Sequence, residues 1–415
     1  MELEDLSIVE KAAMLSGGSE WDSRGNDRAD IPGFVMSDGP HGVRRQLGEG
    51  DHLGIGASKP ATCFPTACTV ANTWDPALAE EMGEALGKEA HDLDVNVLLG
   101  PGMNIKRNPL CGRNFEYYSE DPIVAGRMAA GLIRGIQSNG VSACPKHFAV
   151  NSQELRRQAS NSVVDERTMR ELYLTGFEIA VREAKPMTIM TSYNLINGTY
   201  ANENAHLLQD ILRKDWGFDG AVVTDWGGSN DHALGVKNGS TLEMPCPGGD
   251  SIRELMKAVQ DGKISEADVD ARLDEMLELV LSTHAAVEKA PRTFDAAAHH
   301  KLARRAAAES IVLLRNEGGI LPLKPNEKLA VIGDFAETPR YQGAGSSAVN
   351  ALQVDTLLES IKADDSGITL VGYASGFERQ GAADAEKLEE AVALAKKADT
   401  VLLCLGLDEL RESEG

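Results

Sequence analysis

The stretch Gly217-Phe-Asp-Gly-Ala-Val-Val-Thr-Asp225-Trp226 carries the pattern on which the fold prediction depends. Its run of small and β-branched residues predicts a short buried strand over Ala221–Thr224, and that strand ends directly on the carboxylate of Asp225. One such strand end indicates little, because an aspartate in this place commonly caps the segment that follows. The stretch gains meaning from similar strand ends elsewhere in the chain.

Five further short runs are candidate strands of the same kind. They are Gly33–Met36, Val95–Leu99, Val141–Cys144, Thr188–Thr191 and Ser240–Glu243. Most of them end in, or run directly into, polar residues in a turn-rich context: Met36-Ser-Asp38-Gly-Pro, Cys144-Pro-Lys146-His147, Thr191-Ser-Tyr193-Asn194 and Leu242-Glu243-Met-Pro. Several such ends, spaced along the chain, suggest one shared pocket.

Helical runs separate several of these strands, at residues 76–92 and Asp165–Glu183 among others. Alternating strands and helices predict an α/β fold with a mainly parallel sheet buried under helices. Because the C-terminal strand ends of a (β/α)8 barrel converge on one face, the polar strand ends favour a TIM-like barrel with its site there. A helix that begins at Ser265 closes this part of the chain.

A second domain is expected because 415 residues exceed one ordinary core. We place the barrel at 1–283, a linker at 284–300, and the N-terminal part of an open α/β sandwich domain at 301–415. Its predicted elements are strands at Ile311–Leu314, Leu329–Ile332, Ile368–Val371 and Val401–Leu405 and a helix at Ala382–Ala398. The chain stops just after a strand, so we expect an extension or a second chain to complete this domain.

The composition excludes several classes of partner. A net charge of −23 repels nucleic acid and anionic membrane surfaces, whereas a neutral substrate is unaffected. Glycine-rich phosphate motifs and clustered metal ligands are absent from the sequence, so we expect neither cofactor nor metal. The acidic start does not read as a secretory signal, and six scattered cysteines suit reduced thiols in the cytoplasm. The sequence does not decide whether the chain forms a homo-oligomer.

The residue types at the strand ends suit a sugar. Carboxylate and guanidinium groups bind hydroxyls through charge-assisted hydrogen bonds, and an indole covers the apolar face of a ring. The sequence then resembles the family-three glycoside hydrolases, of the β-glucosidase type, in several motifs and in their order. In the first part of the chain these are Ser37-Asp38-Gly-Pro-His-Gly-Val-Arg44, Gly112-Arg113-Asn-Phe-Glu-Tyr-Tyr-Ser-Glu-Asp-Pro122, Lys146-His147-Phe-Ala and the stretch Gly217–Trp226 quoted above. In the second they are Val312-Leu-Leu-Arg-Asn, Leu321-Pro-Leu and Gly343-Ala-Gly-Ser-Ser347.

The resemblance implies a retaining exo-β-glucosidase that acts by double displacement, with Asp225 as the nucleophile. The residues that it implies for holding the sugar are Asp38, Arg44, Arg113, Lys146, His147, Arg157, Tyr193 and Trp226. It places the acid/base on Glu414, with Glu412 as the fallback, although a solvated acidic tail explains the same residues. It also implies that the Gly343–Ser347 loop lies near the site.

Several alternatives remain at this stage. The residues after Phe148 differ from the branch of the family that removes N-acetylglucosamine, which favours a glucosidase. A β-xylosidase or an α-arabinofuranosidase would use the same scaffold, since specificity depends on outer loops. A phosphorylase, or a sugar-binding protein without activity, is also compatible with the motifs.

Overall fold

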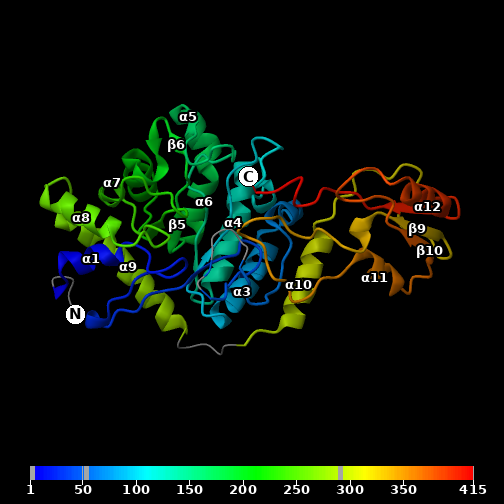
Figure 1. Ribbon diagram of the computed structural model, residues 1–415, viewed down its shortest axis with the longest axis horizontal. Coiled ribbons are helices and arrows are strands. Elements are labelled where there is room, and N and C mark those ends of the chain that lie inside the picture. Colours follow the sequence, from blue (N-terminus) through cyan, green and yellow to red (C-terminus); the bar gives the residue numbers. More distant parts are fainter. Residues whose placement is uncertain (1–4, 49, 51–55, 288–292, 415) are drawn as a thin grey trace. The chain divides into compact units, whose positions relative to one another are not determined.

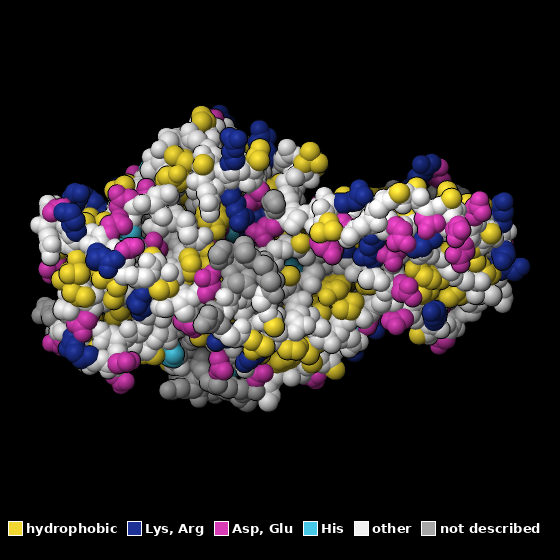
Figure 2. All heavy atoms as spheres, in the orientation of Figure 1, with side chains coloured by type: hydrophobic (Ala, Val, Ile, Leu, Met, Phe, Trp, Pro, Cys, Tyr) yellow, Lys and Arg dark blue, Asp and Glu magenta, His cyan; other side chains and the backbone are white. Residues whose placement is uncertain are grey.

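The computed structural model describes residues 5–48, 50, 56–287 and 293–414. The chain forms two compact units, each described here by itself. The first comprises Met1–Ser310, Ala344–Leu352 and Glu414–Gly415, and the second comprises Ile311–Gly343 and Gln353–Ser413. Figure 1 shows the elements along the chain, and Figure 2 shows acidic and basic side chains interspersed over the visible face.

Short parallel strands form the centre of the first unit, and their residues are buried. They are β1 (Met36–Asp38), β2 (Val97–Leu99), β3 (Ser142–Ala143), β5 (Thr188–Met190) and β8 (Ala221–Val223). The order in one sheet is β1-β2-β3, and β5 pairs with β8. Parallel bridges from Phe148 to Thr191 and from Val223 to Leu242 extend this pattern. The predicted strand at Ser240–Glu243 is present only as such bridges.

Three helices pack side by side against these strands: α3 (Pro76–Asp92), α4 (Pro122–Gln137) and α6 (Thr175–Ala184). Asp75 caps α3 and Asp121 caps α4, each with proline at the first helical position. The two helices approach closely because glycine lies at their contact. A Cβ atom on Gly135 would lie 2.1 Å from the Glu80 carbonyl oxygen.

The remaining helices of the first unit cover its periphery. They are α1 (Ile8–Met14), α2 (Ala67–Val70), α5 (Glu166–Thr168), α7 (His232–Asn238), α8 (Asp250–Gln260), α9 (Glu266–Val287) and α10 (Ala296–Glu309). Two π-helical segments span Met169–Leu174 and His206–Asp215, and 3-10 turns span Asp27–Ala29, Ala71–Thr73, Asn114–Glu116 and Ala201–Glu203. A small sheet joins β4 (Asn161–Ser162), β6 (Leu195–Ile196) and β7 (Thr199–Tyr200).

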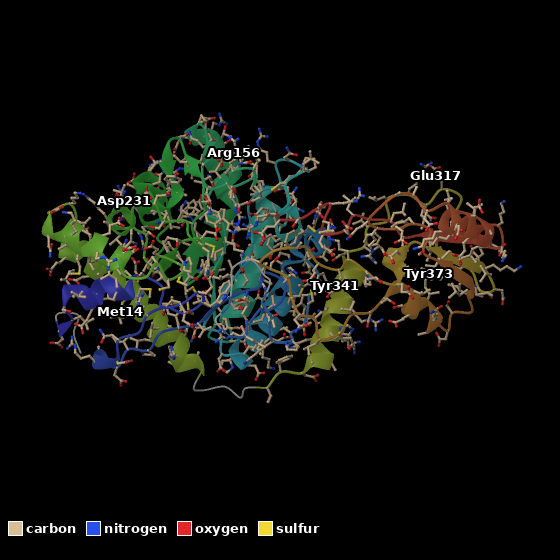
Figure 3. All side chains as sticks on the ribbon, viewed as in Figure 1. Met14, Arg156, Asp231, Glu317, Tyr341 and Tyr373 are labelled. Atoms are coloured by element: carbon tan, nitrogen blue, oxygen red, sulfur yellow. The ribbon has the colours of Figure 1, made fainter. Side chains whose placement is uncertain are left out.

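Two predictions about helices are met. Ser265 begins α9 with the expected reciprocal bonds, because its backbone N–H donates to Asp268 Oδ2 (2.8 Å) and its Oγ accepts from the Asp268 N–H (3.2 Å). The predicted helix at residues 76–92 coincides with α3. Met14, labelled in Figure 3, is one of the fully buried side chains that α1 contributes to the core around α8 and α9.

The second unit is a three-stranded parallel sheet with β9 (Lys328–Ile332) between β10 (Thr369–Ala374) and β11 (Thr400–Leu403). It also contains a 3-10 turn at Asp334–Ala336 and the helices α11 (Leu357–Lys362) and α12 (Ala385–Ala395). Its core is small, and β9 is its most buried strand because it is central.

Three predictions for this part need correction. Ile311–Leu314 is not a strand, because its side chains pack against nothing described and are 57–92% exposed. The strand predicted at Val401–Leu405 ends at Leu403, which lies on a sheet edge and is 61% exposed rather than buried. Residues 301–310 belong with the first unit, since α10 packs against α2 and α3. Of the predicted linker, 288–292 lies outside the described residues.

No helix within the described ranges is long and apolar enough to cross a bilayer.

Candidate active site

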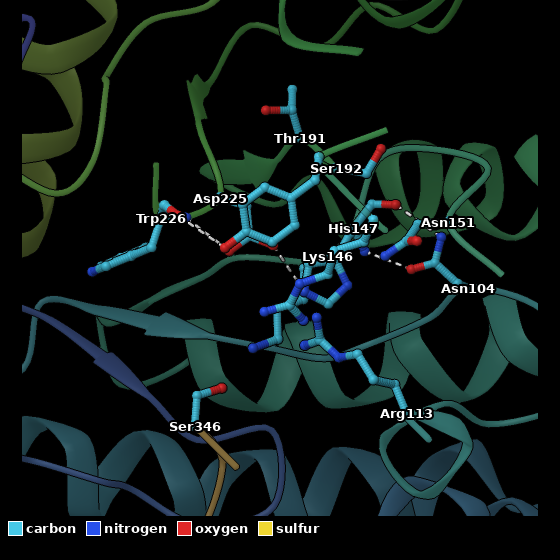
Figure 4. Close-up of polar contacts among 12 residues, drawn as sticks. Asn104, Arg113, Lys146, His147, Asn151, Thr191, Ser192, Asp225, Trp226 and Ser346 are labelled. Atoms are coloured by element: carbon cyan, nitrogen blue, oxygen red, sulfur yellow. Dashed lines mark hydrogen bonds and ion pairs between the residues drawn. The ribbon is translucent and has the colours of Figure 1, made fainter. Parts of the chain in front are cut away.

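The polar residues at the C-terminal strand ends come together in the first unit, as the sequence predicts. Asp38 is the last residue of β1, Lys146 and His147 follow β3, and Asp225 follows β8 by two residues. Figure 4 shows Lys146, His147, Arg113 and Asp225 close to one another, with Trp226 beside them. The shared direction of the parallel strands explains this convergence.

Asp225 is a buried carboxylate with one oxygen held and one oxygen open. Its Oδ1 accepts a hydrogen bond from the Trp226 backbone N–H (2.8 Å). Its Oδ2 has no hydrogen-bond partner among the described residues and lies 3.6 Å from His147 Nε2. Burial raises the pKa of Asp225, against the lowering effect of the Arg113, Lys146 and Arg157 cations. The open oxygen can approach a reacting carbon.

His147 faces Asp225 as a neutral ring. Its backbone is clamped by Asn104, whose amide oxygen accepts from the His147 N–H and whose amide nitrogen donates to the His147 carbonyl, both at 2.8 Å. Its Nδ1 lies 3.0 Å from the Tyr117 hydroxyl. Burial, together with the cations of Arg113 and Lys146, holds the pKa of His147 well below its usual range. This suits a ring that accepts from Tyr117 and directs Nε2–H toward Asp225.

A chain of buried charges lies beside this pair. Lys146 Nζ is 3.0 Å from Asp38 Oδ1 and 3.9 Å from Glu116 Oε2. Glu116 also pairs with Arg113, so each buried charge has an opposite neighbour. Burial lowers the pKa of the Lys146 ammonium, but the carboxylates of Asp38 and Glu116 outweigh it and leave the pKa raised. Lys146 is therefore a charged donor in a site shielded from solvent.

Glu414 lies within reach of two arginines. Its Oε1 is 3.1 Å from Arg157 Nη1 and 3.9 Å from Arg113 Nη1, and its Oε2 accepts from the Ser346 N–H (2.9 Å). Burial would raise its pKa, but Arg113, the Ser346 N–H and Arg157 outweigh burial and lower the pKa to about 2. Glycine at 345 permits the approach, since its φ is +98° and a Cβ there would lie 1.8 Å from Glu414 Oε2.

The remaining predicted residues line the same region. Arg44 is buried and donates from Nη1 to the Ser346 carbonyl (2.8 Å). The Tyr193 hydroxyl donates to the Trp226 carbonyl (2.9 Å), and the Arg157 guanidinium lies 4.9 Å from the Tyr193 ring centre. The Trp226 ring is fixed by a bond from Nε1 to the Glu20 carbonyl (2.9 Å). The predicted Gly343–Ser347 loop thus reaches this region through Ser346.

The structure separates the two acid/base candidates. Glu412 belongs to the second unit and pairs there with Arg340 (Oε2 to Nη1, 2.6 Å), whereas Glu414 belongs to the first. Sequence reasoning overlooked Glu116 and Glu154. Glu116 lies inside a quoted motif, and Glu154 stands three residues before Arg157, a spacing that signals their 3.0 Å ion pair. The described residues contain no cluster of His, Cys, Asp and Glu suited to a metal ion.

Comparison with known proteins identifies relatives across the whole chain. Residues 10–279 match the Glycosyl hydrolase family 3 N terminal domain, and residues 311–415 match the Glycosyl hydrolase family 3 C-terminal domain. Thermostable beta-glucosidase B of Acetivibrio thermocellus and an exo-alpha-(1->6)-L-arabinopyranosidase of Bifidobacterium breve are each 44% identical over 100% of this chain and 55% of their own length.

Solved structures of family 3 enzymes agree with these family matches. The crystal structure of a family 3 β-glucosidase from Bifidobacterium adolescentis superimposes with a TM-score of 0.92 at 42% identity, covering 99% of this chain and 59% of that one. These structures indicate an α/β fold with a TIM-like N-terminal domain. The chain spans somewhat more than half the length of the relatives that it matches.

Proposed function

The chain belongs to glycosyl hydrolase family 3, and from that premise we propose that it carries the catalytic machinery of a retaining exo-β-glucosidase. The observation that carries the proposal is Asp225, a buried carboxylate with an open Oδ2 among three cations. We further propose that the strands of the first unit close into a (β/α)8 barrel, and that a sandwich domain begins after Ser310, where the C-terminal family match starts.

The chemistry proceeds by double displacement. Asp225 Oδ2 attacks the anomeric carbon, the bond from that carbon to the leaving oxygen breaks, and Glu414 gives its proton to that oxygen. The sugar is then held as an ester of Asp225. Glu414 removes a proton from a water molecule, which attacks the same carbon and releases both glucose and the Asp225 carboxylate. The ion pair partners of Arg113 and Lys146 keep both cations in place throughout.

The acid step requires a protonated Glu414, whereas its present partners lower its pKa to about 2. Arg157 supplies part of that effect, and it also forms an ion pair with Glu154. We propose that the hydroxyls of a bound sugar take over donors of Arg157. Burial, which raises the pKa of Glu414, is then opposed by fewer hydrogen bonds from Arg157. The pKa of Glu414 rises and the protonated acid is favoured.

The sugar ring is held, in this proposal, by the groups around Asp225. Asp38 accepts from distal hydroxyls, and Lys146 and Arg113 donate to hydroxyls beside it. His147 donates from Nε2, and Trp226 covers one face of the ring while Tyr193 lies against the nucleophile. Arg44 orients the Gly343–Ser347 loop by donating to the Ser346 carbonyl.

Trapping of the intermediate tests this proposal. The protein is treated with 2,4-dinitrophenyl 2-deoxy-2-fluoro-β-glucoside, whose leaving group needs little help from an acid, and its peptides are then measured by mass spectrometry. A fluoroglucosyl adduct on Asp225 is expected. The exposed Asp219→Asn variant should label equally and Asp225→Asn should not. An adduct on another residue contradicts the assigned nucleophile, and a protein that binds glucose without labelling is a binding protein.

A second candidate activity rests on the relatives. The arabinopyranosidase from Bifidobacterium breve is as similar to this chain as the β-glucosidase from Acetivibrio thermocellus, at 44% identity each. The ratio of kcat/KM for 4-nitrophenyl β-glucoside and α-L-arabinopyranoside decides between them, with xyloside and arabinofuranoside as further substrates. Products formed with and without phosphate exclude or establish a phosphorylase.

The cytoplasmic location also remains a proposal. It is supported by the six cysteines, all of which are free thiols in the structure.

A further inference from the structure

The first unit contains a second hollow, formed by a set of residues different from the one around Asp225. Its volume is about 600 Å³, a size typical of small-molecule sites. The residues that matter for its chemistry are Arg107, Gln153, Val163, Asp165 and Tyr173. None of them has a part in the hydrolysis proposed above, so the hollow has no assigned role.

The walls of this hollow are fixed by hydrogen bonds. The Ser162 hydroxyl donates to the Val150 carbonyl (2.9 Å), which joins β4 to the segment after β3. Asn197 clamps the Val164 backbone by donating to its carbonyl (2.8 Å) and accepting from its N–H (2.9 Å). Asp165 caps α5 by accepting from the Thr168 N–H (3.0 Å). The hollow is therefore preformed and does not depend on a ligand for its shape.

The polar groups of the lining, Arg107, Gln153 and Asp165, are exposed to solvent, and one donor among them has no protein partner in the described part of the chain. The Arg107 side chain makes no hydrogen bond or ion pair with another described residue, although Asp165 lines the same hollow. The Gln153 amide nitrogen is held by Ser160 Oγ (3.1 Å), which keeps the amide at the wall. Tyr173 adds a partly buried aromatic ring, and Val163 adds an apolar surface that is 80% exposed.

This combination suits a neutral, hydroxyl-rich ring. The guanidinium and the amide match hydroxyl oxygens, and the Tyr173 ring matches the apolar C–H face of a sugar. One arginine and one aspartate leave the lining without net charge, and the chain as a whole carries −23. Anions therefore gain no general attraction here.

We infer that this hollow is a second carbohydrate site, which binds a neutral glycosyl unit independently of the pocket at Asp225. Gln153 at its wall is the direct neighbour of Glu154, which holds Arg157 (3.0 Å). The choice of a glucosyl ligand rests on the proposed function, whereas the site itself does not.

A titration with the first pocket blocked tests the inference. Asp225 is labelled with the 2-fluoroglucosyl group, and methyl β-thiocellobioside, which is not hydrolysed, is then titrated calorimetrically. One remaining site is expected. Val163→Trp should fill the hollow and abolish that site without disturbing the fold, because Val163 is largely exposed. Arg107→Ala should weaken binding about tenfold. Leu172→Trp, an exposed neighbour that does not line the hollow, is the matched control and should bind normally.

Three results overturn the inference: a blocked protein that binds no thiocellobioside up to about 10 mM, a Val163→Trp variant that binds like the wild type, or preferential binding of glucuronate or phosphate. If Asp225 cannot be labelled, the proposed hydrolysis fails by itself. The unlabelled protein is then titrated, and Val163→Trp must still remove one of two sites. Turnover of 4-nitrophenyl β-glucoside by Val163→Trp should stay within about twofold of the wild type, because the variant leaves the Asp225 pocket intact.

Discussion

Arg157 Nη1 lies 3.0 Å from Glu154 Oε2 and 3.1 Å from Glu414 Oε1, so one guanidinium nitrogen holds two carboxylates separated by 260 residues. The Glu154 side chain is 5% exposed and the Glu414 side chain 16%. Water screens such a pair poorly, and the position of Arg157 therefore affects the protonation of Glu414 directly. Removal of one member should show in the pH dependence of turnover.

We expect Arg157→Gln to raise the pKa of Glu414, because a cation that favours its ionised form is removed. The basic limb of kcat, which reports loss of the acid proton in the enzyme–substrate complex, should move to higher pH. KM should rise about tenfold through the loss of a charged donor. The neighbouring Arg156→Gln, at an exposed position labelled in Figure 3, should leave both unchanged. An unmoved basic limb would separate Arg157 from the acid.

We expect Asp225→Asn to lower kcat for 4-nitrophenyl β-glucoside by roughly 10⁴-fold or more, because an amide is a poor nucleophile. The thermal midpoint should stay level or rise, since the variant removes a buried charge whose Oδ2 has no hydrogen-bond partner among the described residues. Parallel kinetics and calorimetry measure both effects. A large loss of stability would instead indicate a structural role.

Gly345→Ala should displace Glu414, because the new Cβ would lie 1.8 Å from its Oε2. Hydrolysis of alkyl glucosides, which need an acid, should fall about 10²-fold, whereas dinitrophenyl glucoside should be cleaved almost normally. Gly381→Ala is the control, because Gly381 also has a positive φ (+123°) but a Cβ added there would have no atom within 4 Å. Equal losses in the two variants would point to backbone strain alone.

His232 should make stability depend on pH. Burial lowers its pKa from 6.5 to about 4, against the Glu254 and Asp231 carboxylates, so the folded state favours the neutral ring. Below pH 6.5 the unfolded chain binds more protons, and the free energy of unfolding should fall by roughly 3 kcal/mol between pH 6.5 and 4. Urea unfolding of His232→Asn should show a shallower dependence.

His206 provides the opposite control. Its hydrogen bond with Glu166 raises its pKa, so its contribution is present below pH 6.5 and is lost as pH rises through the folded pKa. His206→Asn should therefore steepen the fall of stability on acidification. The same slope in both variants would contradict the assignment.

The sequence alone was sufficient to predict the polar strand ends and the family. The comparisons confirm the family. Local pattern identified α3 and the start of α9 because caps and periodicity are local signals. Exposure depends on neighbours, and for that reason the apolar run Ile311–Leu314 was misinterpreted as a buried strand. Glu116 and Glu154 were overlooked because their three-residue spacing from an arginine is also that of exposed pairs such as Asp250 and Arg253, so the spacing signals an ion pair but not its burial. The roles of the site residues stay predictions.

The position of Glu414 in the first unit has a consequence for synthesis. Domains fold in order as they leave the ribosome, at about 5–20 residues per second, so the interval between residues 225 and 414 corresponds to roughly 10–40 s. During that interval the nascent chain carries Arg113 and Arg157 with their partners Glu116 and Glu154, but without Glu414, the further carboxylate that lies near both arginines. The pocket of the growing chain therefore holds one carboxylate fewer than that of the finished chain, and it gains its proposed acid only when residue 414 has been added.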